Sequence, residues 1–139
     1  MEQVVCESVS YEAVCPDCGA QLKCWGTQAL AGGRLRWDVE ASCSACDGAA
    51  VVCGGDMPAE RRDQMLAEHG PARLHVSSLP VNGVAIMRVL RAELDLDLAS
   101  AKALARRVVS GVYAGTLPEL EHVARKLRKA GITAAATRE

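Results

Sequence analysis

Apolar and charged residues alternate one by one along residues 34–42. The apolar positions are Leu35, Trp37, Val39 and Ala41, and the charged positions between them are Arg36, Asp38 and Glu40. This period of two is typical of a strand with one buried and one solvent-facing side. Residues 21–25 and 49–53 are predicted to form further strands, with Gly32 and Gly33 as the turn of a hairpin. The first third of the chain is therefore predicted to be a small antiparallel sheet.

From residue 72 onward the pattern becomes mainly helical. Residues 73–77 alternate as a strand, and apolar residues then recur every three or four positions over 83–93 and 98–109. Asn82 and Asp97 are expected to cap these two helices at their N-termini. The sequence therefore predicts a strand followed by two consecutive helices.

The last part of the chain predicts a short extended piece, a third helix and a final strand. The extended piece covers residues 112–114, and the final strand covers 132–137. Thr116 and Glu119 have the spacing of a capping box, and the helix that they open ends at Ala130 and Gly131. The predicted order is β-α-α-β-α-β, with the three helices on one face of a small antiparallel sheet, an α+β fold.

Two Cys-x-x-Cys pairs lie within the predicted β-structure. They are Cys15 with Cys18 and Cys43 with Cys46. A pair with this spacing directs two sulfurs at one ion, and four such sulfurs form the tetrahedral shell that Zn²⁺ prefers. The pattern predicts a zinc ribbon in which Zn²⁺ is structural, because four thiolates leave no open position for water. A segment of about fifty residues buries little surface, so the metal is expected to supply part of its folding free energy.

The same cysteines have a second interpretation, as disulfides of a small secreted domain. Glu2 stands where a signal peptide carries basic residues, and no long apolar run follows it. A cytoplasmic location with reduced thiols is therefore expected. Cys6, Cys24 and Cys53 remain outside the two pairs. We interpret Cys24 and Cys53 as small buried residues of adjacent strands, with a redox role as the alternative.

Composition indicates two modules with opposite charge. Residues 1–71 carry five Lys and Arg against eleven Asp and Glu, whereas residues 72–139 carry eleven against six. We predict a zinc ribbon over 1–55, a linker helix over 56–71 that ends before Gly70 and Pro71, and the second module over 72–139. No segment is long and apolar enough to span a membrane.

The first helix of the second module carries two apolar stripes. Ile86, Val89 and Leu90 share one face and form the expected core side. The second stripe lies opposite, and Lys102 and Arg106 of the next helix extend it. Its members are Val84, Met87, Arg88, Arg91, Lys102 and Arg106. Apolar residues surrounded by basic ones predict a docking surface for an acidic protein partner. The alternative is that a neighbouring element of the same chain covers this stripe.

The second module resembles the C-terminal domain of the bacterial ribosomal stalk protein, large-subunit protein seven/twelve. The resemblance covers roughly residues 72–139 and rests on three segments. These are Asn82-Gly-Val-Ala-Ile-Met-Arg-Val-Leu-Arg91, Leu96-x-Leu98-x-x-Ala101-Lys102 and Ala130-Gly131. In that family the first two helices recruit translational GTPases through two apolar and several basic residues. The resemblance implies this role for Val84, Met87, Arg88, Arg91 and Lys102.

The chain departs from the stalk pattern at two places. The family has glycines on both sides of the leucine in its interhelix turn, whereas Asp95 and Asp97 flank Leu96 here. The family also begins with a dimerising helical segment that anchors it to the ribosome, and a zinc ribbon takes that place in this chain. Ribosome anchoring is therefore not implied.

Together these features predict a non-enzymatic zinc-binding adaptor whose second module docks a protein, with a translational GTPase as the first candidate. One alternative is an immunity or regulatory protein that masks a toxin or enzyme with the same stripe. Another is a nucleic-acid-binding zinc ribbon, which the acidic first half and the lack of an aromatic platform disfavour. No serine or cysteine is spaced with a histidine as a nucleophile and its base.

Overall fold

The computed structural model describes residues 3–77 and 83–138 and divides the chain into two compact units. Unit 1 covers Met1–His69 and unit 2 covers Gly70–Glu139. The fold is α+β, with a four-stranded antiparallel sheet in unit 1 and a three-stranded antiparallel sheet in unit 2.

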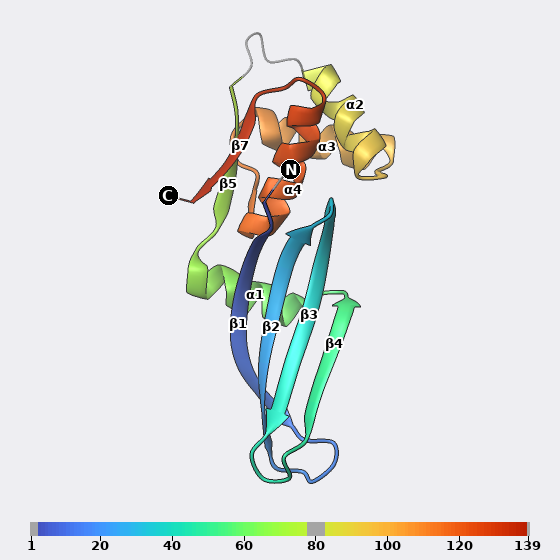
Figure 1. The fold of residues 1–139 in the computed structure, drawn as a ribbon. Coiled ribbons are helices and arrows are strands. Elements are labelled where there is room, and N and C mark those ends of the chain that lie inside the picture. The colour runs from blue at the N-terminus through green and yellow to red at the C-terminus, as the bar shows by residue number, and fades with distance from the viewer. Residues whose placement is uncertain (1–2, 78–82, 139) are drawn as a thin grey trace. The chain divides into compact units, whose positions relative to one another are not determined.

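Unit 1 is an antiparallel meander in which each strand pairs with its neighbour in sequence, in the order β1-β2-β3-β4. The strands are β1 (Val5–Val14), β2 (Gln21–Ala31), β3 (Arg34–Cys43) and β4 (Ala49–Gly55). The β2, β3 and β4 strands were predicted, and β1 is an addition to the prediction. The β1–β2 and β3–β4 connections lie at the same end of the sheet (Figure 1).

One face of this sheet carries a small apolar cluster beneath helix α1 (Ala59–His69). Met65 of α1 is 1% exposed and packs with Val9 of β1 and Trp37 of β3. This helix was expected as a linker between two modules. It belongs instead to unit 1, because its buried methionine completes the cluster on the sheet.

Trp37 is accommodated by a missing side chain on the neighbouring strand. The chain has Gly26 in the middle of β2, next to Val39 in the β2–β3 register. A Cβ atom added at Gly26 would overlap the indole ring of Trp37. Glycine within a strand therefore serves here to let the indole lie close against the backbone.

The two edges of the unit 1 sheet differ. On the outer edge of β1, Nε2 of Gln64 donates a hydrogen bond to the carbonyl oxygen of Ser10, and Nε2 of His69 donates one to the carbonyl oxygen of Ser8. The donor–acceptor distance is 2.8 Å in both. Both donors lie on α1, so the helix supplies hydrogen bonds that an edge strand otherwise seeks from another strand. On the other edge, every residue of β4 is exposed.

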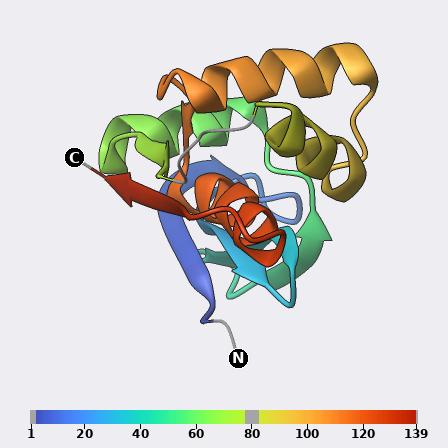
Figure 2. The same cartoon turned by 90° about the horizontal axis from the view of Figure 1, so that it is seen from above.

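Unit 2 has the predicted order β-α-α-β-α-β. Its elements are β5 (Ala72–Val76), α2 (Gly83–Glu93), α3 (Leu98–Val109), β6 (Ala114–Gly115), α4 (Leu117–Lys129) and β7 (Ala134–Arg138). The sheet order is β6-β5-β7, and both pairings are antiparallel. Helices α2 and α3 lie side by side (Figure 2).

The helix ends of unit 2 follow the predicted capping chemistry. The Asp97 side chain accepts a hydrogen bond from the Ser100 N–H, and Thr116 with Glu119 forms a complete capping box. Gly131 has a φ of 86°, as expected after the end of α4. Asn82, the expected cap of α2, lies outside the described residues.

The core of unit 2 joins all three helices to the sheet. Among the described residues, its buried members are Ala72, Leu74, Ile86, Leu90, Ala105, Val108, Leu120, Val123, Ala124, Leu127 and Ala134. They come from β5, β7 and all three helices of the unit, as a helix layer packed on a small sheet requires. None of the helices within residues 3–77 and 83–138 has the length and apolar character needed to cross a lipid bilayer.

Candidate metal centre and docking surface

The two Cys-x-x-Cys segments fold into turns of the same shape. The N–H of Cys15 donates a hydrogen bond to the carbonyl of Ala20, and the N–H of Cys43 donates one to the carbonyl of Gly48. Both bonds have a donor–acceptor distance of 2.8 Å. The residue after each pair adopts the left-handed conformation, with a φ of 76° at Gly19 and 57° at Asp47. Asp47 adopts this conformation without being glycine.

The turns bring all four sulfurs into one cluster. The Sγ atoms of Cys15, Cys18, Cys43 and Cys46 all lie within 4.8 Å of one another. Two of the separations are 3.8 Å, between Cys15 and Cys46, and 3.5 Å, between Cys18 and Cys43. A tetrahedral site with Zn–S bonds of about 2.3 Å has sulfurs about 3.8 Å apart. All seven cysteines are free thiols. The cluster thus has the size of a metal shell.

Backbone N–H groups point at the sulfurs. The N–H groups of Cys46 and Ala45 lower the pKa of Cys43 to about 7. The N–H of Gly48 acts in the same direction on Cys46, but the neighbouring thiols outweigh it and raise the pKa of Cys46 to about 12. The Cys43 sulfur therefore ionises more readily than an ordinary thiol, whereas its neighbours make Cys46 hold its proton more tightly. This donor set suits a divalent metal that binds thiolate.

A metal held by these four sulfurs would stabilise the fold, and a tetrahedral one would have no open position for catalysis. Four protein sulfurs fill a tetrahedral shell, so no position remains for a bound water. Cys15 and Cys43 are buried, whereas Cys18 and Cys46 are exposed. The β1–β2 turn holds one pair and the β3–β4 turn the other. A bound ion would therefore tie the ends of the two hairpins together.

The remaining cysteines do not behave alike. Cys24 on β2 is 4% exposed, as expected for a small buried residue. The prediction for Cys53 was wrong, because this thiol lies on the edge strand β4 and is exposed. The two strands are also not adjacent, since β3 lies between β2 and β4.

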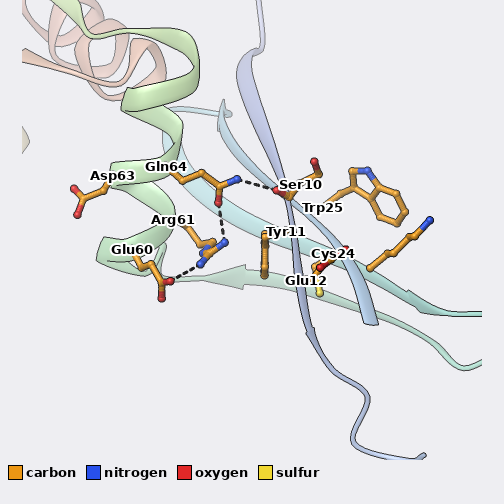
Figure 3. A pocket seen from close by; sticks show the side chains of 10 residues that line it. Ser10, Tyr11, Glu12, Cys24, Trp25, Glu60, Arg61, Asp63 and Gln64 are labelled. Atoms are coloured by element: carbon orange, nitrogen blue, oxygen red, sulfur yellow. Dashed lines mark hydrogen bonds and ion pairs between the residues drawn. The ribbon is translucent and has the colours of Figure 1, made fainter. Parts of the chain in front are cut away.

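A cleft of about 850 Å³ lies between α1 and strands β1 and β2 (Figure 3). Arg61 of α1 lies over the Tyr11 ring, 4.2 Å from its centre. Its guanidinium group also donates to Gln64 Oε1 over 2.7 Å and pairs with Glu60 over 2.8 Å. Sequence reasoning missed this arrangement, because it depends on how α1 packs against the sheet.

The cleft offers a weak nucleophile. Burial raises the pKa of the Cys24 thiol, although the Arg61 charge acts in the opposite direction. The thiol is therefore protonated at neutral pH. Among the described residues that line the cleft there is no histidine to act as its base.

The predicted docking residues lie on α2 and α3. Five of them are exposed: Val84, Arg88, Arg91, Lys102 and Arg106. Val84 is 54% exposed. Met87 differs, because it is partly buried and packs against the core of unit 2. The surface therefore has one exposed apolar residue and four basic ones, and Met87 serves the core as well.

The turn between α2 and α3 shows what the aspartates do. Asp95 has a φ of 52°, a left-handed conformation that glycine adopts more readily. Asp97 caps α3. The acidic residues thus keep a sharp turn between the two helices while placing negative charge beside Arg91. A coulombic contribution from Arg91 helps lower the Asp97 pKa, after the larger effect of hydrogen bonds from Ser100.

Comparison with known proteins finds no protein family that matches the chain and no similar curated protein.

Proposed function

We propose that the chain is a non-enzymatic, zinc-binding adaptor. In this proposal unit 1 is a module stabilised by Zn²⁺, and unit 2 docks a protein partner through the α2–α3 surface. The cluster of four sulfurs carries the first part, because its size and donor type fit tetrahedral Zn²⁺. The four exposed basic residues around Val84 carry the second part.

A translational GTPase is the first candidate partner. The support is the resemblance of residues 72–139 to the stalk domain, together with the element order of unit 2. The departure at residue 95 does not weaken this support, because Asp95 keeps the backbone conformation that a glycine would adopt there. An acidic surface on the partner would complement the excess of basic residues in unit 2.

Elemental analysis of the purified chain tests the metal part. We expect one zinc per chain, held by Cys15, Cys18, Cys43 and Cys46. Replacement of any of these by serine is expected to abolish stoichiometric binding, whereas Cys24→Ala and Cys53→Ala retain it. Full zinc content in a Cys43→Ser variant would contradict the assignment.

Titration against a purified translational GTPase tests the docking part. We expect Arg88→Glu combined with Arg91→Glu to weaken binding and to flatten its salt dependence, because rim charges steer association. Val84→Asp is expected to act through faster dissociation. Met87 is unsuitable for this test, since its contact with the core confounds binding with stability.

A control variant matches the change in charge. Arg73 on β5 and Lys129 at the end of α4 are exposed and lie outside the α2–α3 surface. Arg73→Glu combined with Lys129→Glu alters net charge equally and is expected to retain most of the binding. Equal loss in both double variants would show a general charge effect. No binding by the wild type would reject the GTPase as partner.

A further inference from the structure

β4 is an edge strand of the unit 1 sheet, and among the described residues of unit 1 no element covers its outer edge. All seven residues from Ala49 to Gly55 are exposed, with Val51 at 65% and Val52 at 61%. A long, apolar, uncovered edge strand is a template for pairing with another strand. Natural proteins usually cover or charge such an edge, and β4 contains no charged residue.

The opposite edge shows how the same sheet is protected. Gln64 and His69 of α1 occupy the outward carbonyls of Ser10 and Ser8. The same sheet therefore has one edge, β1, that a helix covers, and one edge, β4, that no described element of unit 1 covers.

The register shows which backbone groups of β4 face outward. Ser10 pairs with Trp25, Trp25 with Glu40, and Glu40 with Val51 across the four strands. In antiparallel pairs, opposite residues turn either toward or away from each other, and this alternates from one strand to the next. Because the Ser10 carbonyl points outward at β1, the same alternation turns the N–H and C=O of Val51 outward at β4.

We propose that β4 pairs antiparallel with β4 of a second copy of this chain, centred on Val51. Antiparallel pairing of a strand with itself has two-fold symmetry, so the assembly closes at two copies. The uncharged strand lets two acidic units meet without placing like charges opposite each other.

The strand edges that each assembly would leave uncovered favour a second copy over an added peptide. A peptide on β4 would itself present a new bare edge. Two copies joined at β4 form one continuous sheet whose outer strands are both β1. Each of those edges already carries the hydrogen bonds from Gln64 and His69. A second copy is therefore the occupant that leaves no apolar edge exposed.

Sedimentation velocity of the full, zinc-loaded chain tests the proposal over a range of concentrations. We expect the wild type to shift from monomer to dimer as concentration rises. Val51→Lys is expected to remain monomeric, because a lysine on the edge opposes strand pairing. Val4→Lys is the control, since Val4 is 63% exposed and precedes the protected strand. It should dimerise like the wild type.

A second variant tests the register without relying on disruption. Paired Val51 residues would place their Cα atoms about 5.5 Å apart, within reach of a disulfide. Val51→Cys is expected to form a covalent dimer on mild oxidation, well above the level that Val4→Cys forms. A wild type that stays monomeric at every concentration overturns the proposal, as does a Val51→Lys dimer.

Discussion

The two units reach stability by different routes. Among the described residues, unit 2 joins eleven buried residues in one core, whereas the apolar cluster of unit 1 has three, Val9, Trp37 and Met65. Cys15 directly follows β1 and lies six residues from Val9, about 20 Å in an extended chain. The far ends of both hairpins therefore lie beyond the cluster. A metal bound by the four sulfurs would therefore hold the strand ends together at the end of the sheet that the apolar cluster does not reach.

Removing one cysteine of the cluster should produce the largest difference in stability between the two units. We expect Cys15→Ser to lose the metal and unfold unit 1 while unit 2 stays folded. Binding of Zn²⁺ to small structural sites is worth about 10–16 kcal/mol, far more than the small cluster can replace. Dispersed amide resonances in a two-dimensional NMR spectrum report each unit. Cys53→Ser is the control, and an intact unit 1 without metal would refute the comparison.

The converse change acts on the core of unit 2. Leu90 is fully buried, so Leu90→Ala should lower the unfolding free energy of unit 2 by about 2–5 kcal/mol. Zinc content should not change. Val112→Ala, at a residue 55% exposed, should change it by less than about 0.5 kcal/mol. Chemical denaturation followed by the resonances of unit 2 measures both, and metal loss in Leu90→Ala would show that the units are coupled.

A smaller effect is expected at the apolar cluster of unit 1. Gly26→Ala would push against the Trp37 indole and should cost about 1–3 kcal/mol. Gly55→Ala on β4 meets no atom within 4 Å and serves as the control. Combining Gly26→Ala with Trp37→Leu should recover part of the loss. Thermal unfolding of the zinc-loaded chain gives these values, and additive losses would exclude the proposed overlap.

Glycine at position 47 is expected to stabilise the turn that holds Cys43 and Cys46. Asp47→Gly removes a side chain from a left-handed position and is expected to stabilise the turn by about 1 kcal/mol. Gly19→Ala places a side chain at the corresponding position of the first turn and should have the opposite sign. Competition with a zinc chelator measures both. The same sign for both changes would contradict the structural equivalence of the two turns.

The smallest effect concerns His122 of unit 2. Burial lowers its pKa from 6.5, and the charges of Lys126 and Arg125 act in the same direction. The unfolded chain thus takes up this proton more readily than the folded one. The stability of unit 2 should be full above pH 6.5 and should fall as the pH drops through the lower folded pKa. His122→Gln should flatten this part of the melting-temperature profile, and an unchanged profile would assign the acid sensitivity to other groups.

Local signals made much of this molecule predictable. The cysteine spacing identified the four-sulfur cluster, because each turn is formed within six residues. The cap at Asp97 and the capping box at Thr116 were predicted from neighbours in sequence, and the structure confirms both. These features need no knowledge of the tertiary fold.

Features that depend on distant contacts were missed. Strand β1 was not predicted because Glu7, a buried acidic residue, interrupts the apolar positions on its inner face. The place of α1 rests on bonds to the backbone carbonyls of Ser8 and Ser10, which side-chain patterns do not reveal. Cys53 is exposed because β4 is an edge strand, and the order of strands in a sheet cannot be predicted from a short segment of sequence. The docking surface on α2 and α3 stays a prediction.

The meander of unit 1 has a consequence for how the chain responds to its surroundings. Strands that pair only with their sequence neighbours form without closing long loops, so the hairpins can assemble early and locally. The two cysteine turns must then come together to complete unit 1. A ligand that binds only the folded form shifts this folding equilibrium as its free concentration rises. The folded fraction of unit 1 would then follow the supply of free zinc in the cell, whereas unit 2, with its own core, would be insensitive to it.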